Sequence, residues 1–224
     1  SKYGVSVRIK DSKGGLISSS SYDYVYKRKK NGERWTSKMV SNLDGDVTET
    51  EYNECCGLPV KIKRGKDITT FKYDRKGHVT QKNTPTEVVK LAYHPRFGKV
   101  TRVNRYSKVT KKKRWSQFKY DKKGNLSFAK NSDKKTVKLF YDGKGRIKTM
   151  RDQSRRRIDF EYNENSKPVK IKDQKLGTIT VEYTDAGRIK NVNSTGGRKI
   201  ALQVTSAFQN LLDIIRPAGV SLSF

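Results

Sequence analysis

Tyrosine recurs along this chain at a nearly constant interval, and that interval limits what the chain can fold into. Seven tyrosines lie 21, 20, 27, 21, 21 and 21 residues apart, namely Tyr52, Tyr73, Tyr93, Tyr120, Tyr141, Tyr162 and Tyr183. The segment Ile200–Val204 lies 21 residues beyond Ile179–Tyr183 and extends the series. Such a period is typical of a repeat architecture in which each unit stacks on its neighbours.

Before each tyrosine, apolar residues or threonine alternate with polar or charged ones. In the last regular repeat, Ile179, Val181 and Tyr183 alternate with Thr180 and Glu182. A period of two predicts a β-strand with one buried side and one side in water.

Turn residues follow the tyrosine in most repeats. Asp121 with Gly124, and Asp142 with Gly145, occupy equivalent places. An aspartate there can bond the turn backbone, and a glycine can adopt a positive φ. A second alternating run then follows, as in Val169–Lys172. Each repeat is therefore predicted to be one β-hairpin.

The hairpins fill most of the chain. Residues 47–204 hold the regular repeats, and residues 1–46 read as degenerate repeats that include an Asn31-Gly32 hairpin signal. Together they predict a single domain over residues 1–204, a β-sheet of about 14 to 18 strands. Open twisted sheets rarely exceed ~10 strands without curling or splitting. We predict a mainly β fold in which tandem antiparallel hairpins form one long curled sheet or incomplete barrel, with the tyrosines inside.

Only the C-terminal part has a different pattern. The apolar residues between Ser206 and Ile215 are spaced for one helical stripe, with Thr205 or Ser206 as N-cap and Pro217 just beyond. We predict a helix over residues 205–216 that packs on or in the sheet as a cap.

The residues around the tyrosines resemble a known family. Tyr73–Val79, Tyr120–Leu126, Tyr141–Ile147 and Tyr183–Ile189 fit a Tyr-Asp-x-x-Gly-x-(Ile/Val) pattern, the last with Thr184-Asp185 after the tyrosine. This pattern resembles the YD-repeat, or RHS-repeat, of RHS and toxin-complex cage proteins. The resemblance implies a long antiparallel sheet that winds into a shell, often around a toxin. The chain is short for a full cage and lacks the DPxGxxxG-type autoproteolytic signature that usually ends such a shell.

Positive charge is the main functional signal. The chain has 51 Lys+Arg against 22 Asp+Glu, a net charge of +29, and residues 99–175 carry 18 of these charges. Such a field attracts polyanions. The predicted polyanion-binding residues lie at hairpin ends, where they are expected to form a basic rim: Lys111, Lys112, Lys113, Arg114, Lys122, Lys123, Lys134, Lys135, Arg155, Arg156 and Arg157. The alternative is that these charges only keep a long sheet soluble and discourage pairing at its edges.

Three aromatic residues lie outside the tyrosine register. Trp35, Tyr106 and Trp115 are therefore the candidates for exposed aromatic contacts.

No catalytic or metal-binding arrangement is predicted. His78 and His94 fall in turns, and the recurring Asp74, Asp121 and Asp142 mark turn chemistry rather than one acid–base pair. The adjacent Cys55 and Cys56 allow a vicinal disulfide or a reactive thiol, but packing is favoured. We predict a protein that is not an enzyme and uses no cofactor and no metal.

The preferred hypothesis is a non-enzymatic binding or structural module of a secreted or surface bacterial system. Its basic face engages an anionic polymer or envelope component, such as lipopolysaccharide, acidic polysaccharide or wall polymer. One alternative is a nucleic-acid-binding protein, and another is a small shell or carrier around an apolar ligand or peptide. A partner protein also stays open. No apolar stretch is long enough for a transmembrane helix, and the expected location is secreted, periplasmic or cell surface.

Overall fold

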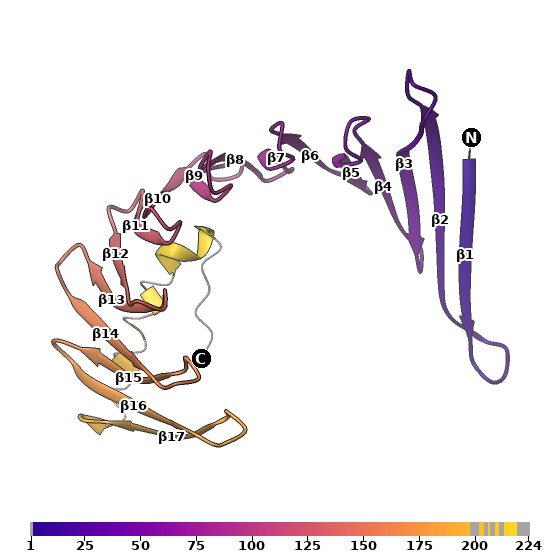
Figure 1. The fold of residues 1–224 in the computed structure, drawn as a ribbon. Coiled ribbons are helices and arrows are strands. Elements are labelled where there is room, and N and C mark those ends of the chain that lie inside the picture. The colour runs from indigo at the N-terminus through magenta and orange to yellow at the C-terminus, as the bar shows by residue number, and fades with distance from the viewer. Residues whose placement is uncertain (1, 198–201, 204–205, 207–208, 211–212, 219–224) are drawn as a thin grey trace. The chain divides into compact units, whose positions relative to one another are not determined.

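The computed structural model describes residues 2–197, 202–203, 206, 209–210 and 213–218, and these are mainly β-strand (Figure 1). Seventeen strands are assigned to one antiparallel sheet. The predicted fold of tandem antiparallel hairpins is confirmed. The chain divides into two compact units, one of residues 1–91 with 105–113 and one of residues 92–104 with 114–224. The single domain over residues 1–204 stays a prediction.

In the first unit each strand pairs with the next strand in the chain. The strands are β1 (Lys2–Lys10), β2 (Leu16–Arg28), β3 (Arg34–Leu43), β4 (Asp46–Tyr52), β5 (Pro59–Arg64), β6 (Asp67–Tyr73), β7 (Val79–Asn83) and β8 (Glu87–Tyr93). The longest of these strands, β2, has 13 residues. The degenerate repeats therefore also form hairpins, with longer strands than the regular ones.

The second unit follows the same plan from β10 to β17. Its strands are β10 (Lys113–Tyr120), β11 (Leu126–Asn131), β12 (Thr136–Tyr141), β13 (Ile147–Asp152), β14 (Arg157–Tyr162), β15 (Pro168–Asp173), β16 (Gly177–Tyr183) and β17 (Ile189–Ser194), and β9 (Val100–Ser107) precedes them. β9 and β10 lie within the 27-residue interval between Tyr93 and Tyr120, and each has 8 residues.

Each repeat turn is built on one side chain that binds the backbone. In the turn after β12, Oδ1 of Asp142 accepts hydrogen bonds from the backbone N–H groups of Lys144 and Arg146, at 3.0 and 2.9 Å. Gly145 closes this turn with a φ of 78°. The backbone N–H of Arg146 holds the pKa of the Asp142 carboxyl below its usual range. The turn chemistry predicted for these aspartates is thus present.

A shift in strand register accompanies the repeat tyrosines. The pairing slips by one residue at the step into Tyr52, Tyr73, Tyr120, Tyr141, Tyr162 and Tyr183. Such a bulge bends the strand locally and re-aims the side chain that follows. The bulge therefore sets the direction of the tyrosine ring.

Five of these tyrosines fasten one repeat to the preceding one. Their hydroxyl groups donate to the backbone carbonyl of the first residue in the strand that follows the previous repeat's turn. The bonds run from Tyr73 to Pro59 at 2.6 Å, Tyr120 to Val100 at 2.6 Å, Tyr141 to Leu126 at 2.8 Å, Tyr162 to Ile147 at 2.7 Å and Tyr183 to Pro168 at 2.9 Å. We call this set the tyrosine ladder. The rings are half-buried, and burial raises the pKa of Tyr141 and of Tyr162 to about 12.

The apolar core is concentrated in the second unit. Leu139 lies opposite Met150, and Met150 lies opposite Ile158, so three buried side chains form one row across β12, β13 and β14. Among the described residues, Val89 alone is a buried apolar side chain of the first unit. The inward side of the second unit therefore carries most of the hydrophobic stabilisation.

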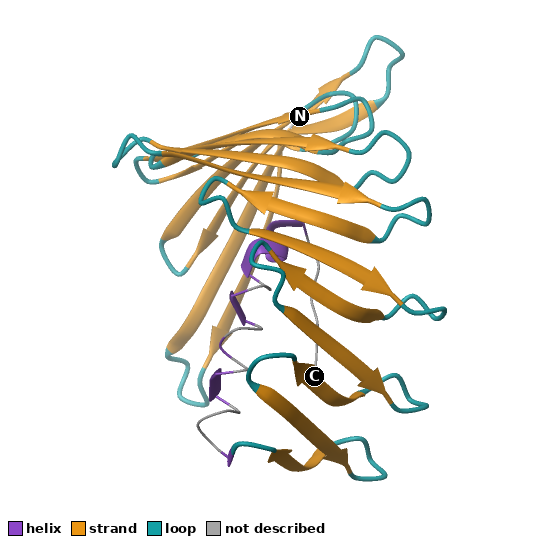
Figure 2. Cartoon of the chain, turned by 90° about the vertical axis from the view of Figure 1, so that its left-hand side faces the viewer, coloured by secondary structure: helices purple, strands orange, loops and turns teal. Residues whose placement is uncertain are grey.

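The C-terminal segment is described in part. Asp213, Ile214 and Ile215 are helical and lead into a short 3₁₀ helix, η1 (Arg216–Ala218), coloured purple in Figure 2. Ile214 and Ile215 are buried, whereas Asp213 is exposed. Of the helix predicted over residues 205–216, residues 205, 207–208 and 211–212 lie outside the described residues, and its packing as a cap stays a prediction.

Candidate functional site

The predicted polyanion-binding residues lie along two opposite sides of the sheet, each formed by the turns at one end of the strands. We call these two rows of turns the edges. Antiparallel strands reverse direction at each turn, so successive turns alternate between the edges (Figure 2). In the second unit, the turns after β11 and β13 lie at one edge and carry Lys134, Lys135 and Arg155. The turn after β10, with Lys122 and Lys123, lies at the other edge. We call the first of these the basic edge.

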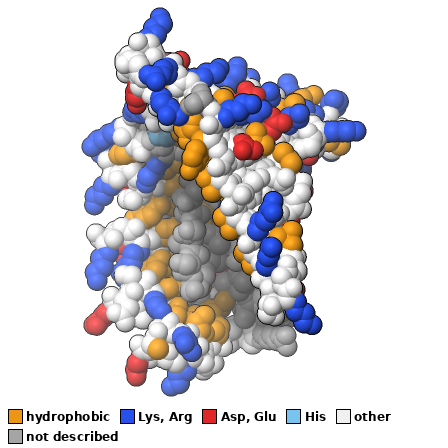
Figure 3. All heavy atoms as spheres, turned by 90° about the vertical axis from the view of Figure 1, so that its right-hand side faces the viewer, with side chains coloured by type: hydrophobic (Ala, Val, Ile, Leu, Met, Phe, Trp, Pro, Cys, Tyr) orange, Lys and Arg blue, Asp and Glu red, His pale blue; other side chains and the backbone are white. Residues whose placement is uncertain are grey.

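Lys111, Lys112 and Lys113 belong to the first unit, whereas Arg114 belongs to the second. Lys111 and Lys112 lie in the turn between β9 and β10, and Lys113 begins β10. All four side chains are exposed. Figure 3 shows Lys and Arg side chains projecting at the margins of one face, as expected for charges at hairpin ends.

Backbone conformation marks two cations of the basic edge. Lys134 and Arg155 have φ of 61°. They occupy the turn position that Gly145 holds after β12, since the backbone N–H of each bonds the carbonyl three residues earlier. The left-handed region costs a non-glycine residue roughly 1–2 kcal/mol. Glycine adopts this conformation without that cost, so the turn does not require Lys or Arg at either position.

The three consecutive arginines have different roles. Arg155 is exposed, and no ion pair is found for it among the described residues. Nε of Arg156 donates to Oδ2 of the buried Asp173 at 2.7 Å, and Nε of Arg157 lies 2.8 Å from Asp159. Arg156 therefore neutralises a buried carboxylate, and it is less available to a ligand than Arg155.

Cations on the outward face extend the basic edge. Side chains alternate along each strand, so the neighbours of the buried Leu139 and Met150 point outward. Lys138 of β12 lies directly opposite Arg151 of β13, which in turn lies opposite Arg157 of β14. Directly opposed like charges destabilise a sheet. Only Arg157 has an acidic partner among the described residues.

A groove of about 590 Å³ runs over these cations. Its walls include four cations and one carboxylate, together with Phe140 and Gln153. The cations are Lys138, Arg151, Arg155 and Arg157, and the carboxylate is Asp152. Oε1 of Gln153 accepts the backbone N–H of Thr136 at 3.1 Å, which links the turn after β13 to the start of β12. We call this feature the outer groove.

A second groove of about 700 Å³ lies on the same side, toward the other edge. Its lining mixes Lys119, Lys123 and Lys138 with Asp121 and Asp142, so its excess of positive charge is smaller than that of the outer groove. The balance of charge makes it a weaker candidate for an anion than the outer groove.

Sequence reasoning missed Lys138, Arg151 and Gln153. Each stands alone in the sequence, so no run of charge marks it. Aligning β12, β13 and β14 by their period of two would have placed Lys138, Arg151 and Arg157 on the outward side.

The predicted aromatic contacts are half-buried. This applies to Trp35, Tyr106 and Trp115. The guanidinium carbon of Arg102 lies 5.7 Å from the ring centre of Trp115. Part of the Trp115 ring is thus already engaged within the protein.

Each of the two histidines interacts with a residue of its own turn. Nδ1 of His78 lies 3.0 Å from Oδ2 of Asp74, and the ring of His94 stacks on Phe97 with centres 4.6 Å apart. In the part of the chain that the structure describes, no cluster of His, Cys, Asp or Glu is suited to hold a metal ion.

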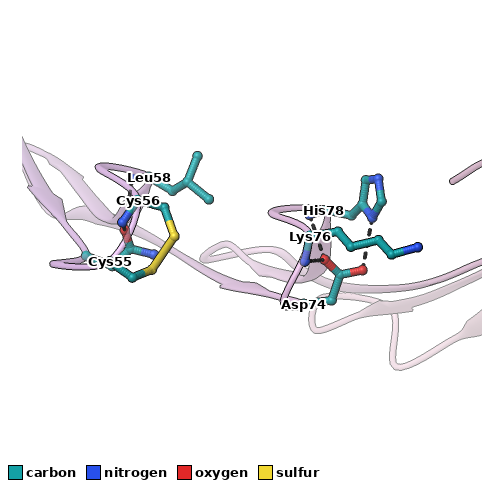
Figure 4. The surroundings of a disulfide bond; sticks show 7 residues. Cys55, Cys56, Leu58, Asp74, Lys76 and His78 are labelled. Atoms are coloured by element: carbon teal, nitrogen blue, oxygen red, sulfur yellow. Dashed lines mark hydrogen bonds and ion pairs between the residues drawn. A yellow bond between two sulfur atoms is a disulfide. The ribbon is translucent and has the colours of Figure 1, made fainter.

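Cys55 and Cys56 form a disulfide in the turn between β4 and β5 (Figure 4). Both residues are exposed. The structure therefore has the vicinal disulfide that the sequence allowed, and not the packing of free cysteines that the sequence favoured.

The comparison with family models shows which family the chain belongs to. Residues 99–224 match the Teneurin YD-shell model. The chain belongs to the Teneurin YD-shell family. The matched range holds most of the second unit, and the YD-repeat resemblance read from the tyrosine pattern is confirmed.

Solved structures with a similar fold include two that contain TcdB2-TccC3. A crystal structure of TcdB2-TccC3-Cdc42 has a TM-score of 0.54 at 10% identity, covering 82% of this chain and 12% of that chain. A crystal structure of TcdB2-TccC3 has a TM-score of 0.52 at 11% identity, covering 80% and 12%. This YD-shell chain thus spans about an eighth of the length of those chains, and the likeness concerns the fold alone. No curated protein matches the sequence.

In this chain, the YD-shell fold consists of β-hairpins, the bulges before the repeat tyrosines and the tyrosine ladder. Among the described residues, no helix has the length and apolar character needed to span a bilayer.

Proposed function

We propose that this chain is a non-enzymatic wall segment of a YD-shell in a secreted bacterial toxin-type system, and that its basic edge engages an anionic envelope polymer. The wall role rests on the family match and on the tyrosine ladder, which joins repeats in series. Similar folds occur in structures of TcdB2-TccC3 complexes, which favours a toxin-type setting and a partner protein.

One observation carries the binding role. Lys134 and Arg155 keep a long cationic side chain at a position that holds glycine in the turns after β10 and β12 and serine in the turn after β14. Solubility alone does not call for a cation at these two positions, since a surface charge elsewhere would serve equally. Anionic polysaccharide, lipopolysaccharide and wall polymer are the proposed ligands, because each presents repeated negative groups.

The chain is expected to bind heparin, used as a model anionic polysaccharide, with an affinity that falls steeply as salt rises. Lys134→Ser/Lys135→Ser is expected to weaken this binding by about tenfold, because hydrogen bonds to charged groups contribute roughly 1.5–3 kcal/mol. Elution from a heparin column and Kd at several salt concentrations are the measurements.

The matched control is Lys122→Ser/Lys123→Ser, which removes two charges from the other edge. It is expected to change the affinity less than the first variant. Equal effects of the two pairs would mean that net charge, rather than the basic edge, governs binding.

A further inference from the structure

The outer groove combines an excess of positive charge with hydrogen-bonding side chains. Its one carboxylate, Asp152, accepts backbone N–H groups of its own turn through Oδ1. Lys138 and Arg151 stand opposite each other without an acidic partner among the described residues. Adjacent strands lie about 4.8 Å apart, so neighbouring cations are close enough to share one anionic group. A bound anion would relieve the repulsion that the register creates.

A cation lies over one face of the aromatic ring in the groove. The guanidinium carbon of Arg151 lies 5.3 Å from the ring centre of Phe140, whose side chain is 45% exposed. Proteins that bind single-stranded nucleic acid stack bases on open aromatic faces. Among the described residues, Phe140 is the one aromatic residue that lines the groove, and Arg151 lies over one of its faces, so the groove offers a stacking surface for at most one base.

The rest of the lining suits a ligand rich in hydroxyl groups. Thr136, Gln153 and Gln174 line the groove beside the cations. Amide and hydroxyl side chains offer both donors and acceptors. A polymer with hydroxyl groups between its charges matches this mixture better than one with flat bases.

We propose that the outer groove, together with Lys134 and Arg155 at its edge, is the binding site for a linear anionic polysaccharide. This inference rests on the proposed function and names its site and ligand class. Sulfate, phosphate or carboxylate groups of the polymer lie against Lys138, Arg151 and Arg155. Sugar hydroxyl groups lie against Gln153.

The first test separates charge from folding. Lys134→Gly/Arg155→Gly is expected to leave the melting temperature unchanged or to raise it by up to about 4 °C, because glycine relieves the left-handed backbone. The same variant is expected to bind a heparin oligosaccharide about tenfold more weakly, with the slope of log Kd against log salt reduced by about 1 for each cation lost.

Ser166→Gly is the matched control, since Ser166 has a φ of 60° in the equivalent turn after β14, at the other edge. It is expected to act on the melting temperature in the same direction and to leave the heparin affinity unchanged. Lys138→Gln/Arg151→Gln then tests the groove itself and is expected to weaken binding by about tenfold or more.

Four outcomes decide the proposal. Weaker binding in both double variants, with the control unchanged, supports it. Heparin binding that neither double variant alters overturns the site but leaves the proposed function standing. Absence of heparin binding by the unaltered chain overturns both. Tighter binding to single-stranded DNA than to heparin, lost in the same variants, overturns the polysaccharide class.

Discussion

Replacing Ile147 with alanine is expected to lower the free energy of unfolding by about 2–5 kcal/mol. Ile147 follows the repeat turn after β12 and is only 4% exposed, so alanine leaves a cavity among packed side chains. Urea unfolding followed by circular dichroism measures the loss.

The control is the same substitution two repeats later. Ile189 holds the equivalent place in the motif but is 53% exposed, and its change to alanine is expected to cost less than about 1 kcal/mol. Similar losses at the two positions would show that the repeats are buried alike, contrary to the structure.

Replacing Tyr141 and Tyr162 together with phenylalanine is expected to cost about 2 kcal/mol, roughly 1 kcal/mol for each hydrogen bond. The rings still pack, but the carbonyl groups of Leu126 and Ile147 lose their donors. Thermal and urea unfolding of the double variant and both single variants measure the effect.

Tyr3→Phe is the control, because Tyr3 is 60% exposed in β1 and outside the tyrosine ladder. It is expected to change stability by less than about 0.5 kcal/mol. A double variant as stable as the unaltered chain would show that the tyrosine ladder does not stabilise the links between repeats.

The hairpins were predictable because their signals are local. An alternation of period two fixes the strands, and Asp142 with Gly145 fixes the turn through bonds within five residues. The tyrosine ladder was not predictable in the same way. Its bonds depend on a bulge that re-aims Tyr141 toward Leu126, and a bulge is a property of the pairing between strands.

The candidate site was predictable in part for a similar reason. Lys134 and Lys135 form a local charge run, and the structure places them at the basic edge with Arg155. Lys138 and Arg151 meet only through strand register, so a search for charge runs passes over them. Because successive turns alternate between the two edges, the order of the turns in the sequence already separates Lys122 from the basic edge.

In this YD-shell segment, the links between repeats and the proposed binding residues lie at different edges. The tyrosine ladder lies at the edge that carries Lys122, where each hydroxyl group reaches the start of the preceding strand. The basic edge lies at the other ends of the strands. Changes that weaken polyanion binding are therefore expected to leave the links between repeats intact.

The most direct measurement of the central claim, that shielded tyrosine hydroxyl groups join successive hairpins, is an alkaline titration of the phenols. NMR with labelled tyrosine, assigned through the single phenylalanine variants, reports Tyr141 and Tyr162 separately. Burial raises the pKa of both to about 12. The folded state thus keeps these protons when the unfolded chain has lost them, so stability is full below about pH 10 and falls as pH rises toward 12. Titration of both phenols near pH 10, with no loss of stability up to pH 12, would contradict the account.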